Sequence, residues 1–469
     1  MKIHFIGIGG IGVSALSQYY LALDHQVSGS DLISSEITDF LKEKGVKIFI
    51  GKHKAKNLPQ DTDLVIYSSA VSFDNPELRR AKKGKIKIKS YPQALGELTK
   101  KYFTIAVSGT HGKSTTAAMI SLILIKAGFD PIVVIGTKLR EFDNSNFRIG
   151  RSKYLVIEAD EWQASFLNYF PQIIVLTNIE REHLDFYKNL KNILKTYKKY
   201  IEYLPKGGVL VANGEDSNIQ KIIRDRISCG GPISLYRLRQ KEAKKLKRIL
   251  KVPGKHNVYN SLAALTVARA LKVPDRVSFQ ALSEYKGAWR RFEIKKFQVS
   301  GFRFQVISDY AHHPTEIQAT LKTAREKWPQ KRIWAVFQPH QYQRTYYLWD
   351  DFVKAFDLAD KVIITKIYEV AGREQKKISK KINSQKLAEA IGKRGKETYF
   401  IEDFEKIPRF LKNKVKSGDI ILIMGAGDIY KLAENIRRSD LREYKEIGSP
   451  SEIRSLRGLT KIKNKKRIE

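Results

Sequence analysis

The chain has 469 residues, of which 42% are apolar types, and it carries a formal net charge of +37. A chain of this length can bury more than one core, so two or three domains are expected. Its single cysteine, Cys229, excludes an internal disulfide and suits a reducing compartment. The first residues hold no apolar stretch long enough for a signal peptide or a membrane span. We therefore expect a cytoplasmic protein with no membrane partner.

The positive charge comes from 86 Lys and Arg against 49 Asp and Glu, a balance that can favour nucleic-acid binding. The lysines, however, are scattered over expected surface helices, such as residues 191–199 and 241–247, and gather again only in the tail. They are not accompanied by zinc-ligand spacing, an aromatic RNA-binding signature or a helix-turn-helix pattern. A solvated, lysine-rich surface accounts for them. We expect no nucleic-acid partner, although the charge could help to collect anionic nucleotides.

Residues 1–98 alternate between strand-like and helix-like segments. The expected strands are Ile3–Gly7, Gln26–Ser28 (which leads into Gly29, Ser30 and Asp31) and Leu64–Tyr67, and the expected first helix is Val13–Leu23. Alternation of this kind predicts an open parallel sheet with helices on both faces.

A glycine-rich turn follows the first expected strand. Residues 7–12 have the spacing Gly-x-Gly-x-x-Gly, and Asp31 lies near the point where an acidic residue would meet a ribose hydroxyl. Such a turn places a pyrophosphate at a helix N-terminus. The motif therefore fits NAD, FAD and a UDP-sugar equally well.

A second glycine-rich turn, at residues 107–116, has the sequence Val-Ser-Gly-Thr-His-Gly-Lys-Ser-Thr-Thr. It lies between an expected strand, Phe103–Val107, and an expected helix, Ala117–Lys126, which is the context of a phosphate-binding loop. Glycines let the backbone approach a polyphosphate, Lys113 adds a charge, and the Ser114 hydroxyl can coordinate Mg²⁺. Val107 stands where the longer pattern has glycine, so this is a short variant. The alternative is an ordinary strand–turn–helix corner; we predict a nucleoside triphosphate site.

Acidic residues follow the next two expected strands. The apolar run Lys153–Ala159 delivers Glu158 and the residues after it, and Ile173–Leu176 delivers the polar segment 177–185 with His183. Ligands bind at the carboxyl edge of open α/β sheets, and a hard cation on a triphosphate needs carboxylate oxygens. His183 is either a structural histidine or a metal ligand.

The remaining chain carries fewer signals. Residues 186–250 are expected to be lysine-rich helices and turns, and Asn257 and Asn260 then share a helix face, or cap a helix, before the apolar segment Leu262–Leu271. Further expected strands are Ile333–Phe337, Val362–Thr365 and Ile420–Met424, each followed by polar residues. They predict a third α/β domain. From Leu441 onward a solvated, partly disordered tail is expected.

Taken in order, nine of these segments resemble the Mur ligase family over residues 1 to about 437. They are HFIGIGGIGVSAL, SGTHGKSTT, EADE, TNIEREHLD, VPGKHNVYN, RRFE, SDYAHHPTEI, VFQPHQYQRT and GAGDI. The resemblance implies an α/β fold of three domains. These are an N-terminal Rossmann-like UDP-sugar domain (1–98), a central ATPase domain (99–288) and a C-terminal Rossmann-like domain (289–440), followed by a basic tail (441–469).

The resemblance implies ATP-dependent amide bond formation. A substrate carboxylate attacks the γ-phosphate to give an acyl phosphate, which the amino group of an amino acid then attacks. The motifs are most similar to the branch that joins L-alanine to the lactyl carboxylate of UDP-N-acetylmuramate in peptidoglycan precursor synthesis. Phosphoryl transfer needs positioning and charge neutralisation, so the lack of a Ser/His/Asp triad is no obstacle. The implied cofactors are ATP and Mg²⁺, for which Mn²⁺ is able to substitute, and the implied state is a monomer or weak homodimer.

The resemblance also assigns residues to roles. The catalytic set is Lys113, Glu158 and His183, and the metal ligands are Ser114, Glu158 and His183. The ATP contacts are Gly109, Thr110, His111, Gly112, Lys113, Ser114, Thr115, Asn257, Asn260, Arg291 and Asp309. The UDP-sugar contacts are Gly9, Gly10, Ile11, Gly12, Ser30, Asp31, Ser68 and Ser69. The pocket for the amino acid and the acceptor carboxylate consists of His340, Arg344 and Gly372.

Two departures from the family pattern concern the amino-acid substrate. Relatives usually continue EADE with Ser-Asp, where this chain has Trp162-Gln163, and the loop at residues 340–344 has one arginine fewer. A sister ligase that uses another amino acid or a preformed peptide is therefore an alternative. A nicotinamide-dependent oxidoreductase built on residues 7–12 is an alternative from another class, but it leaves the phosphate loop unexplained. A nucleic-acid-dependent ATPase would need salt-sensitive DNA binding.

Overall fold

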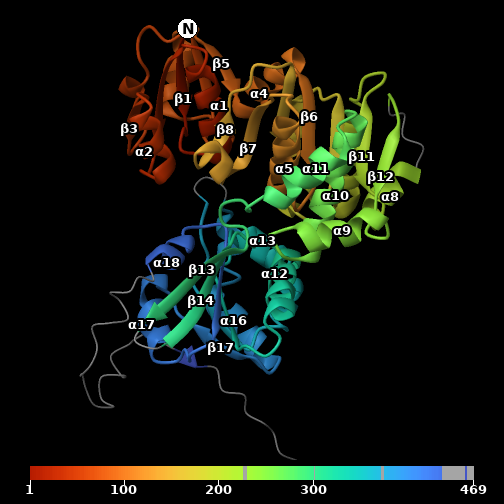
Figure 1. The fold of residues 1–469 in the computed structure, drawn as a ribbon. Helices are drawn as coiled ribbons and strands as arrows, with labels where there is room; N and C mark the ends of the chain where they lie inside the picture. Colours follow the sequence, from red (N-terminus) through yellow and green to blue (C-terminus); the bar gives the residue numbers. More distant parts are fainter. Residues whose placement is uncertain (225–229, 300–301, 371–373, 436–459, 462–469) are drawn as a thin grey trace, which may run out of the picture. The chain divides into compact units, whose positions relative to one another are not determined.

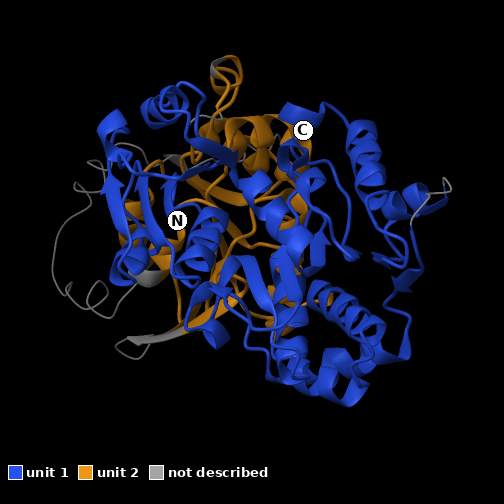
Figure 2. Ribbon diagram, turned by 90° about the horizontal axis from the view of Figure 1, so that it is seen from above, with its two compact units in different colours: residues 1–251, 256–288 blue, residues 252–255, 289–469 orange. Residues whose placement is uncertain are grey.

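The computed structural model describes residues 1–224, 230–299, 302–370, 374–435 and 460–461. The described residues form three β-sheets (Figure 1). The chain divides into two compact units, coloured separately in Figure 2. Unit 1 consists of residues 1–251 and 256–288, and unit 2 consists of residues 252–255 and 289–469.

The N-terminal sheet of unit 1 has five parallel strands in the order β3-β2-β1-β4-β5. Its strands are β1 (Lys2–Ile6), β2 (Gln26–Asp31), β3 (Lys47–Ile50), β4 (Leu64–Tyr67) and β5 (Lys87–Ser90). Its helices are α1 (Ile11–Leu21), α2 (Glu36–Glu43), η1 (Ala55–Asn57), α3 (Pro76–Lys83) and α4 (Tyr91–Lys101). The predicted parallel sheet is confirmed, and α1 begins two residues before the expected Val13.

Different helices cover the two faces of this sheet, because side chains alternate along β1. Ile3 and Phe5 belong to a core that includes residues of α1 and α4. On the opposite face, Ile6 packs with Leu78 and Ala81 of α3. His4 shares the Ile6 face by the same alternation, which directs its side chain toward α3.

The middle sheet of unit 1 has seven strands in the order β12-β11-β10-β6-β9-β7-β8, and β8 alone runs antiparallel to its neighbour. Its strands are β6 (Phe103–Ser108), β7 (Ile132–Leu139), β8 (Ser145–Arg148), β9 (Tyr154–Glu158), β10 (Ile173–Leu176), β11 (Val209–Asn213) and β12 (Ile233–Tyr236). Its helices are α5 (Lys113–Lys126), η2 (Arg140–Phe142), η3 (Trp162–Asn168), α6 (Leu184–Tyr187), α7 (Leu190–Ile201), α8 (Ser217–Arg224), α9 (Lys241–Ile249), α10 (Lys255–Ala270) and α11 (Asp275–Glu284).

The structure corrects two expectations for this sheet. Residues 186–250 are not only helices and turns, because β11 and β12 lie within them. Both strands are short and stand between lysine-rich helices, so the charge pattern hides them. Helix α5 begins at Lys113 and α10 begins at Lys255, earlier than the expected Ala117 and Leu262. The expected helix face shared by Asn257 and Asn260 is therefore present.

The N-terminal and middle sheets are held together within unit 1. Buried apolar residues of both sheets form one continuous core, and α1 packs on β7 and β8. At this junction the Gln18 amide donates to Asn146 Oδ1 at 2.9 Å, and Ser145 Oγ donates to Gln18 Oε1 at 3.0 Å. Buried polar groups that pair in this way fix one relative orientation of the two sheets.

The sheet of unit 2 has seven strands in the order β13-β14-β18-β15-β16-β17-β19, with antiparallel pairs only at its two edges. Its strands are β13 (Glu293–Val299), β14 (Phe302–Asp309), β15 (Ile333–Phe337), β16 (Lys361–Ile364), β17 (Glu397–Phe400), β18 (Ile420–Met424) and β19 (Thr460–Lys461). Its helices are α12 (Pro314–Lys327), α13 (Tyr342–Tyr347), α14 (Trp349–Lys354), α15 (Lys376–Ser379), α16 (Ser384–Lys393), η4 (Phe404–Lys406), α17 (Ile407–Lys412) and α18 (Tyr430–Asn435).

Of the expected tail, 441–469, only Thr460 and Lys461 lie among the described residues, and they pair with β17. Cys229 also lies outside the described residues. Among the helices that the structure describes, none is both long and apolar enough to cross a bilayer.

Candidate active site

The glycine-rich loop at residues 109–112 joins β6 to α5 (Figure 1). In the middle sheet, β6 lies between β10 and β9. Gly109 and Gly112 have φ angles of 135° and 83°, which favour glycine. A Cβ on Gly109 would lie 2.0 Å from Thr177 Oγ1, and one on Gly112 would lie 2.5 Å from Asn260 Oδ1. At these two positions the loop is thus packed too closely against its neighbours for a residue larger than glycine.

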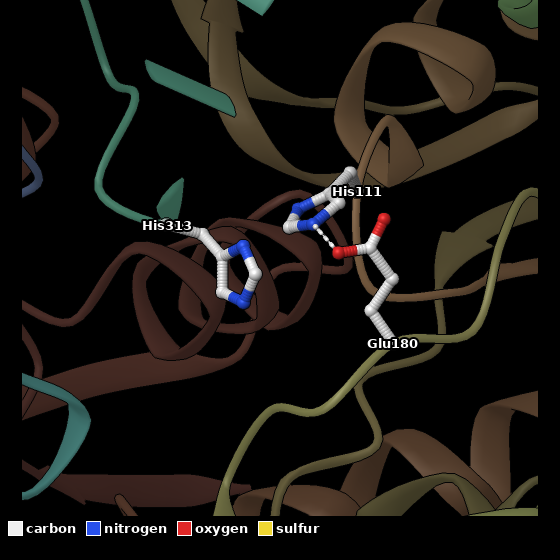
Figure 3. A group of neighbouring side chains, drawn as sticks. All are labelled: His111, Glu180 and His313. Atoms are coloured by element: carbon white, nitrogen blue, oxygen red, sulfur yellow. Dashed lines mark ion pairs between the residues drawn. The ribbon is translucent and has the colours of Figure 1, made fainter. Parts of the chain in front are cut away.

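Asn178, directly after β10, holds this loop in place. Its carbonyl accepts from Thr110 N at 2.9 Å, and its side-chain oxygen accepts from His111 N at 2.9 Å. The Glu180 amide donates to Thr110 Oγ1 at 2.9 Å. The Glu180 carboxylate faces the His111 ring, with 3.5 Å between Oε2 and Nε2 (Figure 3). Asn178 and Glu180 were absent from the residues assigned from sequence.

Lys113 is the first residue of α5, and its ammonium group is largely buried. Nζ donates to Gly109 O at 2.7 Å and to Glu161 Oε2 at 2.9 Å, and it lies 3.8 Å from Asp160 Oδ1. Burial alone would lower the pKa of Lys113, but the charges of Glu161 and Asp160 outweigh it and raise the pKa. Lys113 therefore remains a cation at the helix N-terminus, where the backbone amides of the first turn already favour an anion.

Ser114 and Glu158, which the resemblance assigns to one cation, are in contact. Ser114 Oγ donates to Glu158 Oε2 at 3.0 Å, and Ser114 is 5% exposed. The other carboxylate oxygen accepts from the Gly136 amide, which orients the group. Thr115, the next residue of α5, is buried.

A second acidic cluster consists of Asp160, Glu161 and His183, whose ligand atoms all lie within 4.8 Å of one another. Glu161 is 2% exposed, burial raises its pKa, and its Oε1 has no hydrogen-bond partner among the described residues. His183 adopts a left-handed backbone with φ 53°, at the start of α6. Two carboxylates and an imidazole fit a divalent cation. The sequence assigned only His183 to this site.

Asn257 and Asn260 lie on one face of α10, against the first turn of α5. Thr116 Oγ1 donates to Asn260 Oδ1 at 3.2 Å, and the Asn260 amide donates to Asn257 Oδ1 at 3.4 Å. Both asparagines are 6% exposed. Their amides therefore lie next to the loop at residues 109–112.

The glycine turn after β1 lies between the ends of β2 and β4. Gly9 N donates to Asp31 Oδ2 at 2.8 Å, and Ser68 N donates to Ile6 O at 2.9 Å. The remaining assigned residues of this turn region are Gly10, Ile11, Gly12 and Ser69, and none of them is buried. Ser30 differs, because the residue is fully buried and its hydroxyl donates to Glu77 at 2.8 Å. Its carbonyl accepts from the amides of Gly7 and Ile8, so Ser30 contacts the turn itself.

In unit 2, Asp309 ends β14 and accepts hydrogen bonds from the amides of Phe292 and Ala311, both at 2.8 Å. Arg291 lies with its guanidinium 4.9 Å from the centre of the Tyr310 ring and 4.0 Å from Glu316. Burial raises the pKa of Asp309 from 3.8 to about 6 despite the nearby Arg291.

Arg290, which the sequence did not assign, is 4% exposed and organises the same edge of unit 2. Its guanidinium donates to the carbonyls of Gly425 and Gly427 and contacts the Tyr430 ring at 4.4 Å. The backbone of Arg290 is left-handed, with φ 56°. Arg290 thereby ties the loop after β18 to the segment that carries Arg291.

His340 and Arg344 of the predicted amino-acid pocket are in contact. Arg344 Nη1 donates to His340 Nδ1 at 2.9 Å, and the His340 ring stacks on Tyr368 with centroids 5.5 Å apart. Arg344 is 8% exposed. Gly372, the third predicted residue, lies outside the described residues.

The raised pKa of Asp309 predicts a pH effect on stability. A carboxyl group that holds its proton more tightly when folded stabilises the protein at low pH, and this contribution is lost as pH rises from about 4 to about 6. We expect the thermal midpoint of the wild type to fall relative to that of Asp309→Asn over this range. Calorimetry on both proteins from pH 4 to pH 7 checks this, and parallel curves would contradict it.

These features define a class of protein. Unit 1 holds a glycine-rich loop with a buried lysine, two groups of side chains that could hold a cation near the ends of β6, β9 and β10, and a second sheet with a turn suited to a diphosphate. Such a combination is that of an α/β enzyme that uses a nucleoside triphosphate on a nucleotide-linked substrate.

Comparison with protein families agrees with this class along the chain. Residues 2–103 match the Mur ligase family catalytic domain, residues 107–268 match the Mur ligase middle domain, and residues 290–427 match the Mur ligase glutamate ligase domain. The chain belongs to the Mur ligase family. Its members are ATP-dependent ligases that form C–N bonds, so ATP is the nucleotide cofactor. The predicted family and three-domain α/β fold are confirmed.

Individual relatives are similar over nearly the whole chain. The UDP-N-acetylmuramate–L-alanine ligase of Clostridium botulinum is 43% identical over 453 residues, covering 92% of this chain and 96% of that protein. The enzyme of the same name from Acetivibrio thermocellus is 43% identical over 458 residues, with 92% and 94% covered.

Solved structures show the same similarity. The UDP-N-acetylmuramate-alanine ligase MurC from Thermotoga maritima superposes with a TM-score of 0.77 at 30% identity, covering 92% of this chain and 97% of that one. A murein peptide ligase from Psychrobacter arcticus gives a TM-score of 0.70 at 24% identity, with 95% and 100% covered, and it supports the fold alone.

Proposed function

We propose that this protein joins L-alanine to the lactyl carboxylate of UDP-N-acetylmuramate at the expense of ATP, in the synthesis of peptidoglycan precursors. The observation that carries this proposal is the 43% identity to UDP-N-acetylmuramate–L-alanine ligases over 92% of the chain. The site geometry supports it, because the phosphate loop, its lysine and the acidic strand ends are assembled in unit 1.

In the first step a carboxylate oxygen of the sugar attacks the γ-phosphorus of ATP. The bond from the γ-phosphorus to the β,γ-bridging oxygen breaks, ADP leaves, and an acyl phosphate forms. Lys113 and the loop amides bind the β- and γ-phosphates and offset charge as it moves to the leaving oxygen. Thr110, His111 and Thr115 belong to the same loop and first helix turn, and Asn257 and Asn260, which lie against that turn, would contact the nucleotide.

Two groups of residues fit divalent cations. Ser114 and Glu158 would hold Mg²⁺ on the phosphates, and His183 with Asp160 and Glu161 would hold a second ion, with Mn²⁺ able to replace Mg²⁺. Bound there, the cation supplies neutralisation of phosphate charge. The partnerless, buried Glu161 Oε1 is the observation that supports a cation at the second group.

In the second step the free amino group of L-alanine attacks the acyl carbonyl carbon, the bond to the phosphate oxygen breaks, and inorganic phosphate leaves. As the amide forms, the amine gives up a proton to the departing phosphate or to solvent. His340 and Arg344 of unit 2 are the residues we assign to the amino acid and acceptor carboxylate, with Gly372. Arg344 is a buried cation suited to a carboxylate.

The remaining assignments complete the proposal. We propose that Gly9–Gly12, Asp31, Ser68 and Ser69 bind the UDP-sugar, and that Arg291 and Asp309 contact ATP. Ser30, which the resemblance also assigns to the UDP-sugar, is buried and supports the turn that binds it. We place the enzyme in the cytoplasm, where ATP and UDP-sugars are available, as a monomer or weak homodimer. The domain bounds 1–98, 99–288 and 289–440 are proposed on the same basis.

A substrate panel tests this function. With ATP, Mg²⁺ and UDP-N-acetylmuramate, we expect phosphate release with L-alanine to exceed that with glycine or L-serine by about 10-fold or more, the discrimination that one methyl or hydroxyl can give. A murein tripeptide should give no turnover. Preferred use of the tripeptide would establish the sister reaction instead, and no turnover with any amino acid would refute the proposal. NAD binding without ATP turnover would favour the oxidoreductase.

The departures Trp162 and Gln163 make the panel informative. Trp162 is buried in η3, whereas Gln163 is exposed with a left-handed backbone, φ 51°. Gln343 is also buried, at 4% exposure. Trp162 in unit 1 and Gln343 in unit 2 are thus interior residues at or next to positions where the sequence departs from the family pattern.

A further inference from the structure

A fully buried carboxylate, Glu77, lies in the N-terminal sheet domain, outside the residues assigned above. It is the second residue of α3, and four side chains donate to it. His4 Nε2 and Ser30 Oγ each lie 2.8 Å from Oε2, while His53 Nδ1 lies 2.8 Å and Asn57 Nδ2 3.2 Å from Oε1. These donors come from β1, β2, the segment after β3 and η1, so one carboxylate joins four parts of the domain.

The chemistry of the donors fixes the charge and proton positions in this network. Burial would raise the pKa of Glu77, but the hydrogen bonds from His4, His53 and Ser30 outweigh it and lower the pKa to about 2. An ionised carboxylate only accepts, so His4 carries a proton on Nε2 and His53 carries one on Nδ1. His4 Nδ1 then has Ser28 Oγ at 2.9 Å as its partner.

Glu77 is linked through Ser30 to the glycine turn. The hydroxyl of Ser30 is held by Glu77, and the carbonyl of Ser30 accepts from the amides of Gly7 at 2.8 Å and Ile8 at 3.1 Å. The next residue, Asp31, accepts from Gly9 N at 2.8 Å. The end of β2 thus holds three successive amides of the turn, and Glu77 holds the end of β2.

We propose that Glu77 is a positioning residue for the diphosphate-binding turn of the N-terminal sheet. It acts through Ser30 and His53, keeps residues 7–9 in the conformation that accepts a nucleotide diphosphate, and fixes the tautomer of the partly exposed His53. The ligand identity rests on the proposed function. A buried ionised group stabilises a fold poorly compared with apolar packing, so a positional role explains its presence better than stability does.

The test is Glu77→Gln, which keeps the shape of the side chain and removes its charge and part of its acceptor capacity. We expect KM for UDP-N-acetylmuramate to rise about 10-fold, because small displacements of a binding turn are costly. We expect kcat and KM for ATP to stay within about twofold, since the phosphate loop is on the other sheet. Without ligand, the amides of Gly7, Ile8 and Gly9 should exchange hydrogen about 10-fold faster. Ser30→Ala is a smaller change. It should raise KM for UDP-N-acetylmuramate and the exchange rates of the turn amides, each by less than Glu77→Gln does.

Leu78→Ala is the matched control. Leu78 is the next residue of α3 and packs with Ile6 and Ala81, so its truncation lowers the thermal midpoint without touching Ser30 or His53. The KM of this variant for UDP-N-acetylmuramate and the hydrogen-exchange rates of its turn amides should equal those of the wild type. The inference would be overturned if the turn amides of both Glu77→Gln and Ser30→Ala exchanged hydrogen at the wild-type rate. It would also be overturned if these variants changed KM and exchange no more than Leu78→Ala does. A wild-type enzyme that does not bind UDP-N-acetylmuramate overturns the proposed function instead, and the exchange measurement still decides the role of Glu77.

Discussion

Replacing Lys113 with alanine is expected to lower the turnover of ATP by at least about 10³-fold while leaving the affinity for UDP-N-acetylmuramate nearly unchanged. Lys113 is the buried cation at the N-terminus of α5, hydrogen-bonded to Gly109 O and Glu161. The turn expected to bind the UDP-sugar belongs to another sheet and is held by Ser30 and Asp31. Phosphate release assays and calorimetric titration with UDP-N-acetylmuramate measure the two effects separately.

The control for this variant is Lys126→Ala. Lys126 ends the same helix and pairs with Glu284 at 2.8 Å on the surface, so its loss should leave turnover unchanged. The removal of Lys113 leaves Glu161 buried without its partner. Because burial already raises the pKa of Glu161, we expect this carboxyl to take up a proton, which limits the loss of stability. If folded Lys113→Ala lost ATP turnover and affinity for UDP-N-acetylmuramate to the same extent, the two sites would not be separate.

The parts of the fold that the sequence predicted are those with strong local signals. Strands β4, β10, β15 and β18 have the predicted bounds because each is a short apolar run followed by glycine or polar residues. Strands β11 and β12 were missed because basic helices surround them. The start of helix α5 was predicted too late. Its first turn, which follows the phosphate loop, consists of polar residues, and these weaken the apolar period on which the prediction relied.

The candidate site divides in the same way. Glycine spacing predicted the phosphate loop, and the rule that ligands meet strand ends pointed to the acidic segment that begins at Glu158. The resemblance then selected Glu158, which the structure places in contact with Ser114. Glu161, Asn178 and Arg290 depend on contacts between distant segments or on left-handed backbone, which spacing does not encode. The positive φ of residues 163 and 164, which follow Glu161, is one such feature. Ser30 was assigned to the ligand by resemblance, yet its hydroxyl belongs to the Glu77 network.

Glu161 gives the second large effect. We expect Glu161→Gln to weaken Mn²⁺ binding about 10-fold and to lower kcat by about 10²-fold. The reason is that a neutral amide replaces a buried carboxylate, which pairs with Lys113 and forms a cluster with Asp160 and His183. Spectroscopic titration with Mn²⁺ reads metal binding without turnover.

A graded comparison separates this role from a general loss of negative charge. Asp160→Asn alters the same cluster, but its side chain is 54% exposed, so solvent and other ligands can replace it and we expect a smaller change in Mn²⁺ affinity. Asp185→Asn, just beyond His183, should behave as wild type. If Glu161→Gln bound Mn²⁺ with wild-type affinity, Glu161 would serve Lys113 alone, and its effect on kcat would come from a misplaced lysine. A matching loss in Asp160→Asn would instead assign the cation to the exposed carboxylate.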